Sequence, residues 1–444
     1  MATSSRGQFS SKLGFIMAAA GSAVGLGNIW GFPTQAASNG GAVFLLTYLV
    51  MVFILACPML IAELTIGRYG QSNPIQSLKA IWPNGKLGAV LLGVTAMVTV
   101  SLILSFYAII AGWLIGEFAG SAFDMIGLNS AATWITSFGL ERNLLLMVLF
   151  MALTMYVVRA GVANGIERWS TRLMPALLLL FGLMITYILF QEGAIEGLKM
   201  YLVPDFSHFD ADLLVSAMGQ AFFSLSLGVG TMMVYGSYLQ KDTNIPKTAI
   251  QVALVDTGIA FGAGLLVLPA MFVAKHNGVE IFSAAGELLS SDTLVFAVLP
   301  AMFDTMGGLG ILASMLFFAL MMIAALTSSI SMLEVPVACA IEELKQKRNI
   351  AVLWIGAIIT VVSGLIVFNF GALFGLVIEI TTVYAQPILG MLYALLVGWV
   401  WHRNQVLEEL KQGNPEIENS WFWKIWPTYV RVVCPLMMLL VFFA

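Results

Sequence analysis

Charge is the scarcest property of this 444-residue sequence. Only 10% of its residues are Asp, Glu, Lys or Arg, whereas 60% are hydrophobic. Soluble domains carry about 25% charged residues, so a water-soluble globular protein is excluded. The formal net charge of −4 also offers no basic surface, and we expect no nucleic-acid partner.

Cysteine and histidine are also scarce, with three residues of each. Cys57, Cys339 and Cys434 lie inside apolar stretches, without the close spacing of metal or redox motifs. We therefore interpret them as packing residues. No nucleophile, base or metal-ligand pattern is visible in the rest of the chain, so the sequence predicts that the protein is not an enzyme.

Long apolar stretches fill most of the chain, whose mean hydropathy is +0.94. About 20 apolar residues in a helix cross the hydrocarbon core of a bilayer. We therefore predict an all-α polytopic membrane protein with eleven spanning helices, embedded in a lipid bilayer. The expected spans are 13–37, 42–67, 88–119, 143–160, 172–191, 213–237, 248–274, 308–341, 350–368, 372–401 and 428–443.

The positions of Lys and Arg between these spans predict the orientation. Of the 20 Lys and Arg residues, all but Arg142, Lys199 and Lys275 fall on one side. This side should be cytoplasmic. It would contain the N-terminal segment 1–12 and the loop 402–427, and the C-terminus would be extracellular. The apolar run after residue 12 is too long for a cleavable signal peptide.

Two outer loops, 192–212 and 275–307, are longer than a simple connection needs. The second contains "VEIFSAAGELL" and "DTLVFAVLPAMF", which have helical periodicity but are too short to span a bilayer. We expect these two short helices to form a lid over an extracellular vestibule.

Two spans are interrupted by residues that weaken a helix. The first interruption is "AGSAVGLGNIWGFP" at 20–33, and the second is "FSLSLGVGTM" at 223–232 in the sixth span. A broken helix is tolerated in a membrane where its freed backbone groups are buried in protein or line a cavity. Each interruption is therefore a candidate binding site, although glycine also serves close helix packing.

The interruptions lie five helices apart, so the two halves would have opposite orientations, as in the inverted repeats of many secondary transporters. N–H groups at the start of a half-helix attract anions, and freed carbonyl groups attract cations. Asn28, Ser224 and Ser226 add polar groups at the breaks. The pattern predicts a transport site near the middle of the membrane.

The sequence also bears on other classes of membrane protein. A channel needs a continuous polar path, but the main charges expected inside the membrane are Glu63, Asp256, Glu334 and Glu379. Two alternatives stay open on the sequence. One is a transporter-like amino-acid receptor or sensor, and the other is a carrier for another small amine-containing substrate.

Five segments resemble the signature segments of the neurotransmitter:sodium symporter family. They are "GSAVGLGNIWGFP" at 21–33, "GRYG" at 67–70, "FFSLSLGVG" at 222–230, "GSYLQKD" at 236–242 and "LTSSIS" at 326–331. The resemblance implies the leucine-transporter fold, with a 5+5 inverted repeat over 13–191 and 213–401 and unwound helices 1 and 6. Helix 11 would follow at 428–444.

The resemblance also implies a sodium-coupled symporter that works by alternating access. Eleven spans and the absence of large extracellular insertions are similar to bacterial members, so the expected location is a bacterial plasma membrane. The expected substrates are hydrophobic L-amino acids, both aromatic and aliphatic, such as Trp, Tyr, Phe and Leu.

A substrate site follows from the resemblance, residue by residue. N–H groups of the first break and the Tyr107 hydroxyl would bind the carboxylate, and carbonyl groups at both breaks would bind the ammonium. Val229 stands where a leucine-selective member has phenylalanine, which implies a larger pocket. The implied substrate-binding residues are Ala23, Leu26, Gly27, Ile103, Tyr107, Phe223, Ser224, Ser226, Val229, Ser328 and Met332.

Two Na+ sites are implied in the same way, and their ligands are all oxygen atoms, as a hard cation requires. Asp256 stands where chloride-dependent members have asparagine, so transport is expected to be independent of chloride. The bland alternative is a neutral Asp256 that is hydrogen-bonded within the bundle. The first site would use Ala23, Asn28, Ser224 and Asp256, and the second Gly21, Val24, Ala324, Thr327 and Ser328.

The chain departs from the family pattern at both gates. Gly31 replaces an extracellular arginine, and Ile378, beside Glu379, replaces its acidic partner. The usual charged outer gate is therefore not expected. On the inner side, Phe9 takes the place of a tryptophan.

Two further features are expected at the inner side. Arg6 should pair with Glu342 or Glu343, and the sequence does not choose between them. Gly165 and Pro175 enclose the start of the fifth span, where glycine tolerates unwinding and proline removes a backbone donor. One hypothesis is that this segment unwinds to admit water during inward release; the alternative is a plain helix start.

Overall fold

The computed structural model describes residues 7–281 and 294–443. All regular secondary structure within these residues is helical, which confirms the all-α class. Labels with α denote α-helices, and labels with η denote π-helical or 3-10 segments.

Eight continuous helices in the described residues are long and apolar enough to cross a membrane. Five of them are single α-helices, and three contain π-helical segments. They are Ala42–Gly70 (α3, Ala42–Met51; η2, Val52–Ala56; α4, Cys57–Gly70), α6 (Lys86–Met125), α8 (Leu140–Arg159), Val162–Leu189 (η3, Val162–Glu167; α9, Arg168–Leu189), α13 (Ile245–His276), α16 (Gly307–Glu343), α17 (Arg348–Phe368) and Phe370–Val400 (α18, Phe370–Ile378; η6, Glu379–Ala385; α19, Gln386–Leu395; η7, Leu396–Val400).

The two interrupted spans are broken where the sequence predicts. The first consists of α1 (Lys12–Ala23) and a second piece, Gly27–Ser38, bent by 55° against it. This second piece contains η1 (Gly27–Gly31) and α2 (Phe32–Ser38). The sixth is divided into α11 (Ala211–Ser224) and α12 (Thr231–Ser237). Length and composition support up to nine spans in the described residues, so the total of eleven stays a prediction.

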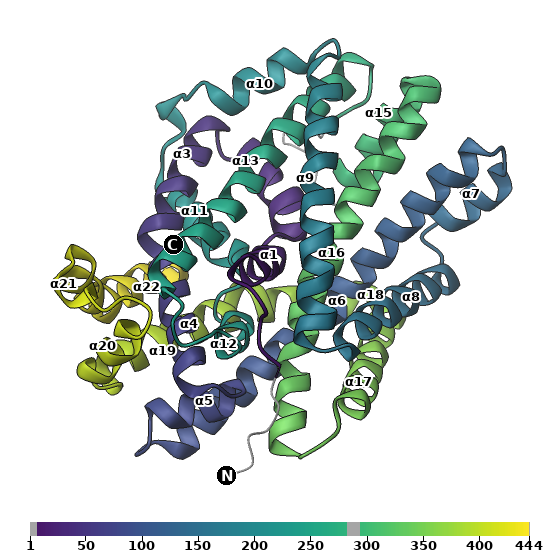
Figure 1. Cartoon of the computed structure of the whole chain (residues 1–444). Helices are drawn as coiled ribbons and strands as arrows, with labels where there is room; N and C mark the ends of the chain where they lie inside the picture. The colour runs from purple at the N-terminus through teal and green to yellow at the C-terminus, as the bar shows by residue number, and fades with distance from the viewer. Residues whose placement is uncertain (1–6, 282–293, 444) are drawn as a thin grey trace.

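Shorter helices connect the spans or follow them. Figure 1 shows α7, α10 and α15 toward one end of the molecule, and α5 near the start of the chain at the other. The shorter helices are α5 (Pro74–Ile81), α7 (Asn129–Thr136), α10 (Ala194–Leu202), η4 (Phe206–His208), η5 (Leu294–Val298), α15 (Leu299–Thr305), α20 (Arg403–Lys411), η8 (Ile417–Asn419), α21 (Trp421–Thr428), η9 (Tyr429–Val433) and α22 (Cys434–Phe443).

The expected lid lies partly outside the described residues. Residues 294–305 form a short apolar helix, as the periodicity of the sequence predicts. Most of the other expected lid helix, at 279–289, falls within 282–293, which the structure does not describe. A lid at this position therefore stays a prediction.

α1 lies at the centre of the bundle, in contact with α9, α13 and α16 (Figure 1). Helices in lipid gain little from burying apolar surface, so close packing at small residues becomes important. A Cβ on Gly67 would lie 1.9 Å from the Met233 carbonyl oxygen, and one on Gly236 would lie 2.6 Å from that of Leu64. The "GRYG" and "GSYLQKD" segments thus pack backbone to backbone where α4 meets α12.

Arg68 of the "GRYG" segment ties this packed pair to the loop 402–427. Its side chain is fully buried, and its Nε lies 2.6 Å from Oε1 of Glu409 in α20. The guanidinium also donates to the carbonyl oxygens of Glu409 and Thr243. Lys241 Nζ lies 3.4 Å from Oε2 of Glu409. The "GRYG" segment therefore holds α20 against α4 and the loop that follows α12.

Candidate functional site

The first break places free backbone N–H groups beside Tyr107. After α1 ends, Val24 has an extended backbone (φ −69°, ψ 107°). The Leu26 N–H then donates to the Tyr107 hydroxyl oxygen at 3.3 Å. Gly25 must lack a side chain, because a Cβ there would lie 2.6 Å from Ser328 Oγ and 2.9 Å from Tyr107 Oη.

The second break, at residues 225–230, is held in a left-handed conformation. Ser226, Gly228 and Gly230 have φ of 52°, 84° and 80°. Glycine adopts this region freely, whereas a residue with a side chain rarely does. Ser226 Oγ donates to the Ser22 carbonyl oxygen at 3.0 Å, and the Gly228 N–H donates to Glu63 Oε1 at 2.7 Å. The second break is thereby bonded to the first.

One narrow cavity lies between the two breaks. Its volume of about 30 Å³ has room for about two water molecules. All the residues that the sequence implied for substrate binding line it, although that role stays a prediction. They are Ala23, Leu26, Gly27, Ile103, Tyr107, Phe223, Ser224, Ser226, Val229, Ser328 and Met332.

Five other lining residues were not predicted for any site. Ser22, Gly25 and Thr231 lie within the interrupted segments, so the break itself was a usable signal. Val100 faces the cavity one helical turn before a predicted residue of α6. Gln386 of α19 had no local signal, because its position depends on how α19 packs in three dimensions.

Three of the four residues implied for the first sodium form a buried hydrogen-bonded cluster. Asn28 Nδ2 donates to Asp256 Oδ1 at 2.7 Å and to Ser224 Oγ at 2.9 Å. Ser224 Oγ donates to Asp256 Oδ2 at 2.7 Å, and the Tyr48 hydroxyl donates to Ser224 Oγ at 3.2 Å. Asn28 Oδ1 accepts from the Gly25 N–H at 3.2 Å. A cation here would meet carboxylate and hydroxyl oxygens directly, but Asn28 would have to exchange partners to offer its oxygen.

The residues implied for the second sodium also converge. Ser328 Oγ lies 2.9 Å from the Val24 carbonyl oxygen and 3.3 Å from that of Gly21. Thr327 Oγ1 lies 3.0 Å from the Ala324 carbonyl oxygen. These carbonyl and hydroxyl oxygens suit a hard cation such as Na+. The described residues hold no group of three or more His, Cys, Asp or Glu side chains that could bind a metal.

Aromatic side chains surround a second, wider cavity next to this site, with a volume of about 810 Å³. Trp30 lies one helical turn beyond Gly27, and its ring centroid is 5.7 Å from that of Phe296. Trp113 lies 5.5 Å from Phe296 and 5.9 Å from Phe374. Rings from four separate helical segments (η1, α6, η5 and α18) therefore meet where the second half of the first span leaves the narrow cavity.

No charged gate spans this aromatic cavity in the described part of the chain. Glu379 is exposed and accepts from Tyr384 at 3.4 Å, and the salt bridges of the described residues do not include it. Gly31 faces Gln220, whose Nε2 instead donates to the Gly27 carbonyl oxygen at 2.9 Å. Gly31 and Ile378, the positions of the charged pair that the resemblance implies for other members, thus carry no charge.

At the other end, Phe9 is buried against aromatic rings of α12 and of the residue that follows it. Its ring centroid lies 5.6 Å from that of Tyr235 and 6.2 Å from that of Tyr238. The Tyr238 hydroxyl donates to Glu334 Oε1 at 2.6 Å, and Glu334 also pairs with Arg348. Phe9 therefore packs against Tyr238, which bonds to an ion pair between α16 and α17.

The expected Arg6 pairing lies outside the described residues. Both of its candidate partners bind the turn before α5. Glu342 Oε2 accepts from the Asn73 backbone N–H at 2.7 Å, and Glu343 Oε1 accepts from Asn73 Nδ2 at 2.9 Å. The choice between Glu342 and Glu343 stays open.

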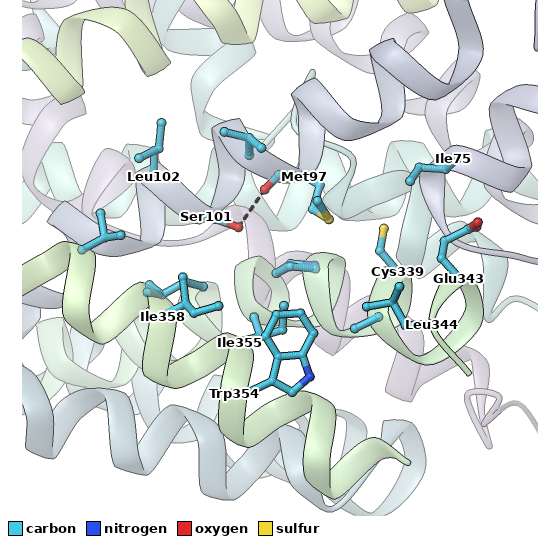
Figure 2. Close-up of a pocket in the computed structure, with 15 residues that line it drawn as sticks. Ile75, Met97, Ser101, Leu102, Cys339, Glu343, Leu344, Trp354, Ile355 and Ile358 are labelled. Carbon is cyan, nitrogen blue, oxygen red and sulfur yellow. Dashed lines mark hydrogen bonds between the residues drawn. The ribbon is translucent and has the colours of Figure 1, made fainter. Parts of the chain in front are cut away.

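A separate cavity of about 400 Å³ lies between α5, α6, α16 and α17. Figure 2 shows Leu102, Ile355 and Ile358 among its mainly apolar lining. Ser101 Oγ bonds back to the Met97 carbonyl oxygen at 2.7 Å, so its hydroxyl is satisfied within α6 (Figure 2). This cavity offers little to a zwitterionic amino acid.

The sequence matches the family model of the sodium:neurotransmitter symporters over residues 6–137 and 117–444. The chain belongs to this family. The symporter is 34% identical to the uncharacterized sodium-dependent transporter YhdH of Bacillus subtilis (strain 168), over 98% of this chain and 96% of the relative. It is 32% identical to an uncharacterized sodium-dependent transporter of Haemophilus influenzae, over 98% of this chain and 97% of the relative.

A solved structure shows the same architecture. The crystal structure of MhsT in complex with L-phenylalanine superposes with a TM-score of 0.83 and 36% sequence identity, covering 99% of both chains. The match confirms the leucine-transporter fold. The symporter is thus a sodium-dependent, multi-pass membrane transporter and not an enzyme.

Proposed function

We propose that this symporter imports hydrophobic L-amino acids together with two sodium ions, without chloride, across a bacterial plasma membrane. The observation that carries the proposal is the single cavity between the two helix breaks, which every implied substrate residue lines. Its polar groups come from the breaks and from Tyr107, Ser328 and Gln386, while Val100, Ile103, Val229 and Met332 give it an apolar part.

The balance of these two parts favours a hydrophobic amino acid. The Leu26 N–H and the Tyr107 hydroxyl suit a carboxylate, and carbonyl groups at the breaks suit an ammonium. Ile103, Val229 and Met332 would contact the substrate side chain. Because these side chains are apolar, charged amino acids would lose their hydration without gaining a partner.

MhsT, which resembles this chain over its whole length, was crystallised with L-phenylalanine. This likeness supports an aromatic amino acid as one substrate. Val229 is smaller than the phenylalanine of a leucine-selective member, so a cavity that widens around its substrate should carry tryptophan and tyrosine along with phenylalanine and leucine.

The buried Asp256 supports both sodium coupling and chloride independence. Its carboxylate is held by Asn28 and Ser224, and all three side chains are buried. An ionised carboxylate within a membrane needs a compensating cation. Because the charge of Asp256 is covalent, no mobile anion is required beside sodium.

Uptake into proteoliposomes tests this function. The purified protein should accumulate labelled phenylalanine, tryptophan and leucine when sodium is imposed outside, and potassium in place of sodium should abolish uptake. Asn28→Ala should reduce uptake at low sodium, whereas Asn404→Ala, on the exposed face of α20, should not. Sodium-dependent binding without accumulation would indicate a receptor and contradict the proposal.

A further inference from the structure

A wide apolar groove runs along the outside of the bundle, between α6 and the span Phe370–Val400. Its volume is about 780 Å³, and none of the described residues that line it is charged. The lining residues Leu91, Tyr384, Ile388 and Trp399 are exposed, so the groove opens away from the interior of the bundle. The Thr95 hydroxyl in its lining bonds back to the Leu91 carbonyl oxygen at 2.8 Å. We call this space the lateral groove.

One end of the lateral groove carries two indole rings and a cation. Trp399 Nε1 donates to the Arg431 carbonyl oxygen at 2.9 Å, and the Arg431 guanidinium carbon lies 3.8 Å from the centre of the Trp399 ring. This distance is within the range of a cation–π contact. Trp82 belongs to the same end, because α5, which ends one residue earlier, contacts η7. A Cβ on Gly85 or Gly88 would lie 1.9 Å or 2.6 Å from the Trp82 ring, so two glycines seat this ring on the start of α6.

The positive charge of Arg431 is not neutralised by a carboxylate of the described chain. Arg431 is exposed, and the salt bridges of the described residues do not include it. Lys424, about two helical turns earlier, is also exposed and lies with its Nζ 5.2 Å from the centre of the Trp421 ring. The nearest carboxylate along the span, Glu379, lies twenty residues before Trp399, which is about 30 Å of helix. The groove is therefore polarised, with its cations at one end.

This cationic end lies on the side that the Lys and Arg distribution predicts to be cytoplasmic. Tryptophan side chains are typical of the boundary between membrane and water. Anionic lipids give the cytoplasmic leaflet a negative surface potential, and basic pockets between spanning helices on that side bind anionic headgroups. An apolar groove with a cationic, indole-framed end fits both parts of such a lipid.

The cavity shown in Figure 2 lacks this arrangement. It is also mainly apolar, but Glu343 lies at one end of it, and none of its described lining residues is a cation. The Trp354 indole there is bonded to Gln346 Oε1 at 2.5 Å. A phosphate in that cavity would meet a carboxylate, so charge distinguishes the two spaces.

We propose that the lateral groove binds a phospholipid whose headgroup carries a net negative charge. The phosphate lies at Arg431, between the rings of Trp82 and Trp399, and an acyl chain follows the apolar lining toward Ile380. From Val400 to Ile380 the lining extends over about 30 Å of helix. Because the whole hydrocarbon core is about 30 Å thick, the groove is long enough for a chain of one leaflet.

The bound lipid supports the helix that packs on the second break. Ala385 lines the lateral groove, whereas the next residue, Gln386, lines the narrow cavity. A Cβ on Gly228 would lie 2.2 Å from the Gln386 carbonyl oxygen, so α19 packs directly against the second break. Two π-helical segments, η6 and η7, flank α19. An acyl chain in the groove adds contacts to α19 on the side away from the break.

Native mass spectrometry of the full-length protein tests recognition of the headgroup. Titration should show that the first phosphatidylglycerol, which is anionic, binds about fivefold more tightly than zwitterionic phosphatidylcholine, since one Lys or Arg near the membrane surface contributes about this factor. Arg431→Gln should lower the affinity for phosphatidylglycerol to that for phosphatidylcholine. Arg403→Gln is the matched control, because Arg403 is also exposed and lies 5.4 Å from the centre of the Trp423 ring, but neither residue lines the groove. This control should keep the wild-type preference.

A second pair of variants tests the seat of the acyl chain. Thr95→Trp fills the groove from α6 and should abolish retention of the tightly bound phosphatidylglycerol. Thr186→Trp in α9 is the control, because Thr186 is also exposed and bonds back to its own helix, at the Gly182 carbonyl oxygen, but does not line the groove. It should retain the lipid.

A measurement on the unaltered protein covers the case in which Thr95→Trp does not fold. In nanodiscs of phosphatidylglycerol, amides of residues 388–400 should exchange with deuterium several-fold more slowly than in nanodiscs of phosphatidylcholine. Amides of α8, which does not line the groove, should exchange at equal rates in both. Equal exchange of residues 388–400 in the two lipids would contradict the proposal.

Three other results would also overturn it. An equal loss of phosphatidylglycerol in Arg431→Gln and Arg403→Gln would assign the lipid to general surface charge. Retention of the lipid by a folded Thr95→Trp variant would place it elsewhere. A lipid-free dimer that Thr95→Trp dissociates would assign the groove to a second copy of the chain. None of these measurements uses an amino acid or a sodium gradient, so their failure leaves the proposed transport function standing.

Discussion

Asp256 carries a full negative charge, if ionised, at a position with no measurable exposure. Its two partners, Asn28 and Ser224, are neutral. An ionised carboxylate within the bilayer costs at least about 2.5 kcal/mol, so either a cation or a proton must compensate it. A sodium ion at the implied first site would fill this need.

Asp256→Asn should therefore weaken sodium dependence, and chloride should partly restore it. We expect the apparent sodium affinity to fall by about tenfold or more, which corresponds to about 1.4 kcal/mol or more. Uptake by the variant should be measured with chloride and with gluconate as the anion. If the variant transports normally and is indifferent to the anion, Asp256 does not balance the sodium charge.

Val229 should set the size of the substrate. Val229→Phe adds a ring to the apolar wall of the cavity, so uptake of tryptophan should fall relative to that of leucine. Changes of a few carbon atoms in an apolar pocket alter discrimination by about 10- to 200-fold, and a shift of about tenfold is expected here. Competition assays with both amino acids measure it, and Val229→Leu should give an intermediate ratio. An unchanged ratio would show that Val229 does not contact the substrate.

At the scale of single elements, the Arg68 and Glu409 pair is the contact that fixes α20 to the bundle. Both side chains are buried, so neither charge can turn to water when the other is removed. Removal of one partner from a buried pair typically costs about 3–5 kcal/mol. The neighbouring Glu408 is exposed and provides a comparison within the same helix.

We therefore expect Glu409→Ala to lower the free energy of unfolding by about 3–5 kcal/mol, and Glu408→Ala to change it by less than about 0.5 kcal/mol. Denaturation of both variants in detergent, followed by tryptophan fluorescence, measures the difference. Equal stability of the two variants would mean that α20 is held by other contacts.

The sequence predicted those elements whose cause is local. Hydropathy predicted the long spans. Glycine spacing predicted both breaks, because glycine has more conformational freedom than other residues and destabilises the helix in which it lies. The residues of the cavity came from matching family motifs. Ser22 and Thr231 could also have been predicted to line the cavity, since they lie inside the interrupted segments.

Contacts between distant elements could not be read in the same way. The Ser10 N–H donates to Glu167 Oε2 across 157 positions, and Arg68 pairs with Glu409 across 341. Neither pair has a local pattern that marks it, and both depend on how the helices pack. Gln386 entered the cavity for the same reason. The partners of polar residues at helix ends thus could not be predicted from the sequence, because they depend on the tertiary structure.

At the scale of the whole molecule, sodium and substrate should act as one thermodynamic unit. The cavity between the breaks shares Ser224 with the first cation cluster and Ser328 with the second. Ligands that bind at adjoining groups and favour the same closed arrangement increase each other's affinity, and linkage requires the two factors to be equal.

Saturating sodium should therefore raise phenylalanine affinity by the same factor by which saturating phenylalanine raises sodium affinity. Couplings of this kind are typically about 5- to 150-fold. Calorimetric titrations in both orders give the two factors. Phenylalanine binding that is equally strong with and without sodium would rule out coupling at this site.

The oxygens gathered around Ser328 Oγ belong to the main chain at the end of α1 and just after it, at Gly21, Ser22 and Val24. A main-chain carbonyl is present whichever amino acid a codon specifies, so point mutation cannot delete these oxygens one at a time. Substitution at Val229 or Met332, by contrast, reshapes the cavity wall at once. During evolution, the main-chain oxygens that face the ion therefore persist through most substitutions, while substrate specificity can diversify among descendants.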